Sequence, residues 1–181
     1  MISDEDVVEL IQKGDREKFG EIIKRYQGKL FGYIKNLINQ NNMEVEDVVE
    51  DSLVSAYENL NGFDTSKKFS SWIYRIAHNK AVDYFKKKKI KKESLEDRDE
   101  ILETGKEKLI EELEIEKERK MAVNKAVKNL ELKYREVVLL YYFEEKNYEE
   151  ISDILHISIG NVGVLLYRAK EKLKILLNNK R

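Results

Sequence analysis

The chain has 181 residues, of which 38% are charged and 41% hydrophobic, and its formal net charge is −1. It contains no Pro, no Cys and only 8 Gly, which excludes disulfides and cysteine metal sites and disfavours a turn-rich sheet protein. No apolar run approaches the ~20 residues of a membrane span, and the acidic N-terminus does not have the layout of a signal peptide. These features favour a cytoplasmic, helical protein without direct membrane insertion.

The first part of the chain predicts three helices. A short helix follows the N-cap Ser3 and ends near Lys13, and a second one runs over about 16–38 with apolar residues along one side. A third helix, over 44–60, has an acidic side opposite its apolar side, and a turn at Asn61 and Gly62 ends it. The residues expected to face inward from this third helix are Val45, Val48, Val49, Leu53, Ala56, Tyr57 and Leu60.

Aromatic and basic residues gather in the next stretch, a loop over 63–68 and a helix over about 69–88. Residues 67–92 contain ten Lys or Arg and one acid, a balance of +9, although the whole chain is nearly neutral. Cations bind phosphates and flat rings stack on exposed bases, so this stretch indicates contact with unstacked nucleic acid. Helical spacing assigns Trp72 to the core rather than to base contact. The expected outward residues are Tyr74, Arg75, His78, Asn79, Lys80 and Asp83.

Residues 93–105 have dense charge and few apolar residues, which predicts a flexible linker between the two halves, with bounds at 93–115. Helices are expected to resume near Leu109 and to continue, after a break, over about 133–144. The predicted fold is therefore all-α, with two small helical domains, residues 1–92 and 116–181, joined by a flexible charged linker.

The C-terminal stretch has the spacing of a helix-turn-helix. Asn147 and Glu150 form a capping-box pattern at the start of a helix that ends at His156, and Ser158 caps a long final helix. Two helices joined by such a tight turn are typical of this motif, although an ordinary helical hairpin has the same spacing. Base or phosphate contacts would come from the first turn of the final helix, with Arg168 and the lysines after it binding the DNA backbone.

Enzymatic chemistry finds no support in the residues. The two histidines, His78 and His156, fall in separate domains, no Gly-rich phosphate loop is present, and no metal or cofactor site is predicted. Asp153 and His156 have the spacing of a metal pair, but no second pair accompanies them. Two other classes of protein stay open on composition and spacing: a stand-alone helix-turn-helix regulator that binds duplex DNA as a dimer, and a helical adaptor that binds only protein.

Both halves together resemble one family, the bacterial sigma-70 sigma factors, and within it the small extracytoplasmic-function (ECF) group. In the first half the matching stretches are Glu46–Asp51, Ala56–Tyr57, Phe69–Asn79 and Ala81–Tyr84. In the second half they are Tyr148–Ile151, Ile157–Val162 and Tyr167–Lys170. Two separate motif sets in the right order make the resemblance specific. A helix-turn-helix alone would be weak evidence for this family.

The resemblance implies an alternative sigma factor that binds core RNA polymerase, through its beta-prime and beta subunits, and promoter DNA. It also implies restraint by an anti-sigma factor, which in this group is often a membrane protein. The first domain, region two, would bind the beta-prime coiled-coil through Glu44, Asp47, Glu50, Asp51, Val54 and Glu58. It would read and melt the minus-ten element through Asn61, Asp64, Thr65, Ser66, Tyr74, Arg75, Asn79, Lys80, Asp83, Lys86 and Lys87. The second domain, region four, would bind the minus-thirty-five element through Ser158, Gly160, Asn161, Val164, Tyr167, Arg168 and Lys170.

The chain departs from the family pattern in one place on the DNA-facing helix. Family members often have Lys-Ser-Arg-Leu where this chain has Gly163, Val164, Leu165 and Leu166. Two cations are therefore missing from that helix, while Leu166 keeps the core position. The departure leaves the predicted fold unchanged and concerns only how this domain contacts DNA.

Overall fold

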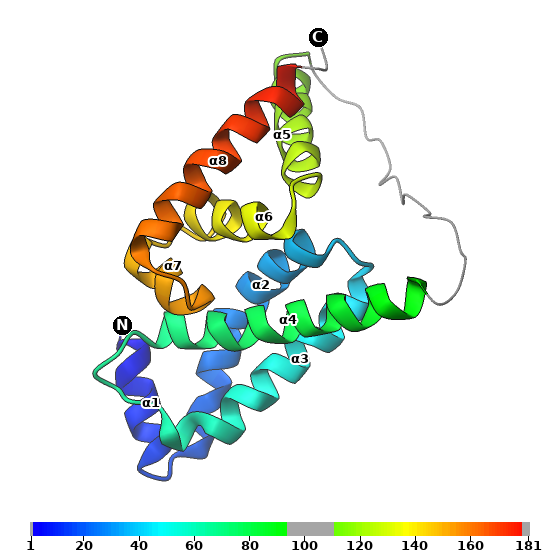
Figure 1. The fold of residues 1–181 in the computed structure, drawn as a ribbon. Coiled ribbons are helices and arrows are strands. Elements are labelled where there is room, and N and C mark those ends of the chain that lie inside the picture. The colour runs from blue at the N-terminus through cyan, green and yellow to red at the C-terminus, as the bar shows by residue number, and fades with distance from the viewer. Residues whose placement is uncertain (1, 94–110, 179–181) are drawn as a thin grey trace.

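The computed structural model describes residues 2–93 and 111–178, and all the regular elements in these two ranges are helices (Figure 1). The first range contains α1 (Asp4–Gln12), α2 (Phe19–Ile38), α3 (Asn42–Asn59) and α4 (Phe69–Glu93), with short 3₁₀ turns at Arg16–Lys18 and Leu60–Gly62. The second contains α5 (Glu111–Lys128), α6 (Leu132–Val138), a π-helical turn (Leu139–Phe143), α7 (Tyr148–Leu155) and α8 (Ile159–Asn178). The predicted all-α fold with two helical domains is confirmed.

The first domain is built on the apolar sides of α2, α3 and α4. Leu30, Ile34 and Leu37 of α2 are fully buried, as are Val45 and Ala56 of α3. Burial of this kind is the main source of helix stability in small domains, because propensity alone is weak. Trp72 packs against the core between Phe63 and Phe69, with ring centroids 5.1 and 5.6 Å away, as its spacing predicted. The inward placement predicted for Tyr57 is wrong, because its side chain is 40% exposed at the end of α3.

The second domain packs α6, α7 and α8 around Val137, Ile151, Ile154, Val162 and Leu166, all of them buried. Its predicted helix over 133–144 is one α-helix followed by a π-helical turn. A π turn adds a residue to the helical repeat, so it rotates the side chains that follow it relative to the buried stripe. Leu139 and Leu140 stay buried, whereas Tyr141, Tyr142 and Phe143 emerge at the surface.

The two domains lie against each other, with α7 packed on the N-terminal half of α4 and α6 close to α2 (Figure 1). Residues 94–110, which hold most of the predicted linker, lie outside the described residues, and 111–115 form the first turn of α5. Among the helices that are described, none is long and apolar enough to span a membrane.

Candidate nucleic-acid interface and partner surface

The outward side of α3 is acidic. Asp47, Glu50, Asp51 and Glu58 are exposed together with Val54, which is 50% exposed. Glu44 differs from the others, because its carboxylate accepts a hydrogen bond from the Lys88 Nζ of α4 at 2.6 Å. No Lys or Arg lies between Asn41 and Asp64, so the sequence offers these carboxylates no local cation. The partner of Glu44 comes instead from a helix that is distant in the sequence.

An apolar groove of about 800 Å³ runs beside this acidic side, between α2 and α3. It is lined by Phe19, Ile23, Phe31, Val49, Leu53, Val54 and Tyr57, with Arg16, Glu46 and Glu50 among its polar residues. Sequence periodicity had assigned most of these apolar residues to the core, because it does not distinguish a core from a groove that stays open. An apolar groove with an acidic rim has the character of a surface that receives an amphipathic, basic helix.

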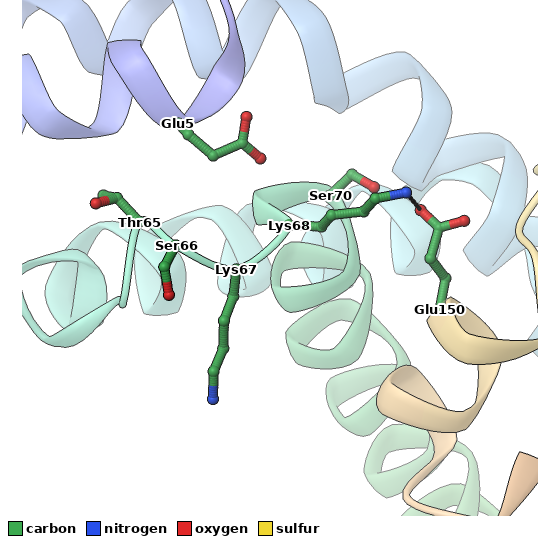
Figure 2. Close-up of a pocket in the computed structure, with 7 residues that line it drawn as sticks. All are labelled: Glu5, Thr65, Ser66, Lys67, Lys68, Ser70 and Glu150. Atoms are coloured by element: carbon green, nitrogen blue, oxygen red, sulfur yellow. Dashed lines mark hydrogen bonds and ion pairs between the residues drawn. The ribbon is translucent and has the colours of Figure 1, made fainter.

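The loop between α3 and α4 borders a small pocket of about 340 Å³, where Thr65, Ser66 and Lys68 come near Glu5 of α1 and Glu150 of α7 (Figure 2). Asp64 shapes this loop, because its Oδ1 accepts hydrogen bonds from the Ser66 amide at 3.0 Å and the Ser66 hydroxyl at 2.7 Å. These bonds lower the pKa of the Asp64 carboxyl. Asn61 is exposed, and within the described ranges its side chain makes no hydrogen bond.

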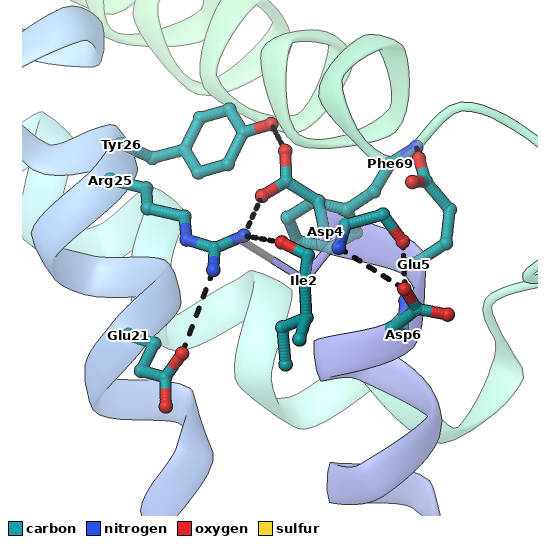
Figure 3. Close-up of polar contacts among 9 residues, drawn as sticks. Ile2, Asp4, Glu5, Asp6, Glu21, Arg25, Tyr26 and Phe69 are labelled. Carbon is teal, nitrogen blue, oxygen red and sulfur yellow. Dashed lines mark hydrogen bonds and ion pairs between the residues drawn. The ribbon is translucent and has the colours of Figure 1, made fainter.

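Helix α1 holds the loop and the start of α4 in place (Figure 3). Glu5 accepts a hydrogen bond from the Phe69 amide at 2.8 Å and so caps the first turn of α4. Asp4 anchors α1 on α2, since it accepts from Arg25 at 2.6 Å and from the Tyr26 hydroxyl at 2.5 Å. Gln12 donates to the carbonyl oxygens of Leu60 and Phe63, which fixes the beginning of the loop.

The predicted minus-ten residues of α4 fall on two different sides of the helix. Asn79, Asp83 and Lys86 are three or four residues apart, so they share one face, and all three are exposed, as is Lys87. Arg75 and Lys80 are half-buried. The outward orientation predicted for Tyr74 and His78 is wrong in this structure, because the second domain covers them and leaves them 2% and 8% exposed.

The contact between the domains is polar where it covers Tyr74. The Tyr74 hydroxyl donates to the Glu144 carboxylate, and the Lys146 ammonium lies 4.7 Å from the centre of the Tyr74 ring and donates to the Ser70 hydroxyl at 2.8 Å. Lys68 pairs with Glu150 at 3.3 Å. Burial raises the pKa of Glu144 and lowers that of Lys146, because removal from water disfavours the charged form of each group.

A second polar cluster joins the domains deeper in the contact. The Tyr33 hydroxyl lies 2.9 Å from His78 Nδ1, and His78 Nε2 lies 3.7 Å from a carboxylate oxygen of Glu136. Arg135 donates to the carbonyl oxygen of Leu37 at the end of α2, at 2.7 Å. Burial raises the pKa of Glu136 to about 7, against the opposing charge of Lys86, and lowers the pKa of His78 to about 4.

We expect Glu136→Gln to make the chain acid-sensitive between pH 6.5 and 4.5. In the wild type a raised glutamate pKa stabilises the folded chain at low pH and a lowered histidine pKa stabilises it at high pH, so the two pH dependences cancel across this window. Removal of the carboxyl leaves only the histidine. The free energy of unfolding should then fall by about 2 kcal/mol more than in the wild type as the pH drops from 6.5 to 4.5.

His78→Gln is the matched control and should give the opposite sign, with stability lost as the pH rises from 4.5 to 7. Denaturant unfolding of the three proteins at each pH measures their free energies of unfolding. The differences between proteins are compared, because the titration of other carboxyl groups is common to all three and cancels. Parallel pH profiles for all three would show that these two groups do not carry the effect.

The C-terminal helices form the helix-turn-helix that their spacing predicted. Asn147 accepts from the Glu150 amide at 2.9 Å and Glu150 accepts from the Asn147 amide at 3.0 Å, which completes the capping box of α7. His156 ends α7 in the left-handed conformation with a φ of 53°, and Ser158 caps α8 through the Asn161 amide. The predicted minus-thirty-five residues Ser158, Gly160, Asn161, Val164, Tyr167, Arg168 and Lys170 are all exposed on α8 or at its cap.

The cations of α8 are not equally available to DNA. Lys172 pairs with Glu131 at 2.9 Å, and Lys174 pairs with Glu171 at 2.7 Å. Arg168 and Lys170 are exposed, and neither forms an ion pair with any residue that the structure describes. These two are therefore the best placed to bind phosphates.

An exposed aromatic cluster on the second domain was missed by sequence reasoning. Tyr141, Tyr142, Phe143 and Tyr148 are between 37% and 51% exposed, and the Tyr141 ring centre lies 4.8 Å from that of Tyr142 and 5.6 Å from that of Tyr148. The sequence feature that could have indicated this cluster is the apolar run 137–143, which is too long to be buried on one face of a helix. No group of three metal-ligating side chains is found in the described part of the chain.

Comparison with known proteins agrees with this architecture. Residues 22–90 match the family model for sigma-70 region 2, and residues 120–173 match the one for sigma-70 region 4. The ECF RNA polymerase sigma factor SigW of Bacillus subtilis is 31% identical over 176 residues, which cover 92% of this chain and 92% of that protein. The ECF RNA polymerase sigma-E factor of Haemophilus influenzae is 27% identical over 96% of this chain and 94% of its own length.

Two solved structures share the fold at low sequence identity. CnrH, in complex with the cytosolic domain of CnrY, superposes with a TM-score of 0.72 at 23% identity and covers 98% of this chain and 99% of its own. RpoE of Bartonella quintana, in complex with the anti-sigma factor NepR, has a TM-score of 0.72 at 19% identity and covers 91% of this chain and 99% of its own. With both regions matched in order along nearly the whole chain, the protein belongs to the ECF group of the sigma-70 family of sigma factors.

Proposed function

We propose that the chain binds core RNA polymerase in the cytoplasm and directs transcription from promoters that it recognises at two elements. The family is not enzymatic, so the chain acts by binding. One observation carries the proposal: the exposed polar face of α4 and the helix-turn-helix of α7 and α8 occur in one chain that also exposes an acidic partner surface on α3. A duplex-binding regulator needs only the helix-turn-helix.

The acidic side of α3, with the groove beside it, is the surface that we assign to the beta-prime coiled-coil. Asp47, Glu50 and Asp51 would attract basic residues of the partner, while Val54 and Tyr57 offer apolar contact beside them. For the beta subunit we assign the aromatic cluster of the second domain, because exposed aromatic residues are enriched at protein interfaces.

In the first domain, Asn79 and Asp83 of α4 and Asn61 of the loop would contact bases of the minus-ten element. Sequence on a melted strand is read from bases that are splayed out of the stack, and amide and carboxylate groups can bond to their edges. Lys86 and Lys87, one to two turns further along α4, would bind phosphates and position the strand without reading it.

Promoter binding requires the two domains to part. The minus-ten and minus-thirty-five elements are about 25 base pairs apart, which is roughly 85 Å along the duplex. Helix α7 packs on the first half of α4, which is itself only 25 residues long, and α8 follows α7 directly. With α4 and α8 held this close together, the chain cannot reach both elements at once. The polar contact that covers Tyr74 would therefore break when polymerase and promoter bind.

An anti-sigma factor is the proposed inhibitor. Both structural neighbours were solved with a protein bound, the cytosolic domain of CnrY in one case and the anti-sigma factor NepR in the other. A factor that covers the groove between α2 and α3 would compete with the polymerase for it.

Run-off transcription on a genomic library with purified core polymerase tests the proposal. We expect discrete start sites that share two upstream elements and that disappear when the chain is left out. A chain that directs no initiation but binds duplex DNA tightly as a dimer, by gel shift and solution mass, would instead be a stand-alone regulator.

A further inference from the structure

The DNA-facing side of α8 is apolar over its first turns. Ile159, Val164 and Tyr167 expose 49%, 46% and 68% of their surface, and Gly160 and Gly163 contribute no side chain. Among the residues from 158 to 167, only Ser158, Asn161 and the Tyr167 hydroxyl can form side-chain hydrogen bonds with a base edge. The first cation of the helix is Arg168, beyond the second turn.

Gly160 is not explained by packing within the protein. A methyl group added there would meet nothing within 4 Å, whereas one added at Gly163 would meet the Tyr148 ring at 3.5 Å, so Gly163 faces the neighbouring helix α7. Glycine within a helix costs stability relative to alanine, so the fold alone would favour alanine at Gly160. Glycine is, however, the residue that lets a backbone approach another molecule closely.

We propose that α8 recognises its promoter element chiefly through the C5-methyl groups of thymines, which Val164 and its apolar neighbours contact while Gly160 lets the helix lie deep in the major groove. The thymine methyl is the one apolar group that the four bases present there, whereas guanine is most often read by Arg or Lys. The inference rests on the proposed function, in which α8 binds duplex promoter DNA.

The remaining polar side chain of the first turn fits the same kind of element. Asn161 is exposed, and the asparagine amide matches the N6 and N7 positions of adenine, the base that pairs with thymine. Among the described residues of α8, Arg168 and Lys170 are the exposed cations that form no ion pair, and they would bind phosphates without selecting a base. The element recognised by α8 is therefore expected to be rich in A·T pairs.

Replacement of thymine by deoxyuridine tests this directly, because it removes the methyl group and keeps every hydrogen-bonding position. The template is a promoter mapped with the holoenzyme, with each thymine of the upstream element replaced in turn and initiation measured at subsaturating holoenzyme. We expect at least one replacement to lower initiation by about fourfold, the effect of one methyl group withdrawn from water. Equal initiation from thymine and deoxyuridine at every position would overturn the inference.

Two protein variants locate the contact. Val164→Ala should abolish most of the difference between thymine and deoxyuridine at one position, because the partner of the methyl group is gone. Ile175→Ala is the matched control, since Ile175 is 60% exposed on the same helix but lies three turns further on, and it should leave the difference intact. A full thymine effect in the Val164→Ala holoenzyme would also count against the inference.

A scrambled upstream element separates this inference from the proposed function. If scrambling leaves initiation unchanged while the holoenzyme still opens the promoter, α8 reads no duplex element, and both the thymine contact and that part of the proposed function fail. If scrambling lowers initiation but deoxyuridine does not, the proposed function stands and only the thymine contact is wrong.

Discussion

Reversal of Asp47 and Asp51 to Lys is expected to weaken the binding of core RNA polymerase by about tenfold or more. The two carboxylates lie one turn apart on the exposed side of α3, and like charges placed against a basic partner cost several kcal/mol. The folded chain should tolerate the change, because exposed substitutions usually alter the free energy of unfolding by ~0.5 kcal/mol or less. A pull-down of core polymerase without DNA, with thermal melting of each variant, measures both quantities.

The matched control reverses Glu149 and Asp153 to Lys. These carboxylates are also exposed and one turn apart, but they lie on α7 of the second domain, so the net charge changes equally without touching α3. Core binding that falls equally in both double variants would show a general charge effect, and core binding unchanged by the α3 substitutions would sink the assignment of this surface.

Asn79→Ala and Lys87→Ala are expected to affect promoters in different ways. Asn79 is exposed on α4, and loss of a contact to a base edge should lower the discrimination between promoters by about 1–3 kcal/mol. Lys87 is an exposed cation beyond the residues proposed to contact bases, so its loss should weaken binding to all promoters alike. It should also reduce, by about 1, the slope of the logarithm of the binding constant against the logarithm of the salt concentration.

Permanganate footprinting of open complexes, with core polymerase and a panel of promoters at two salt concentrations, distinguishes these outcomes. The same promoter ranking for both variants and the wild type would mean that α4 holds the strand without reading it. Specificity would then depend on α8 alone.

Patterns local in the chain determined much of this protein. Helix positions followed from apolar periodicity. The N-cap at Ser3 and the capping box at Asn147 formed as predicted, because a cap depends on residues three positions apart. The helix-turn-helix and the acidic side of α3 are local in the same sense, and the two motif sets were enough to indicate the family. The roles of the individual site residues stay predictions.

Tertiary structure decided which of the residues predicted to be exposed are in fact covered. Tyr74 and His78 were predicted to face outward together with Asn79, yet the second domain buries them. Their partners Glu144 and Glu136 are about 60 to 70 residues away in the chain. Glu44 found its cation in Lys88 for the same reason, and a π-helical turn brought Tyr141 and Tyr142 to the surface. Periodicity reports which residues share one face of a helix, but which molecule or domain packs on that face depends on contacts between distant segments, and these appear only when the chain is folded.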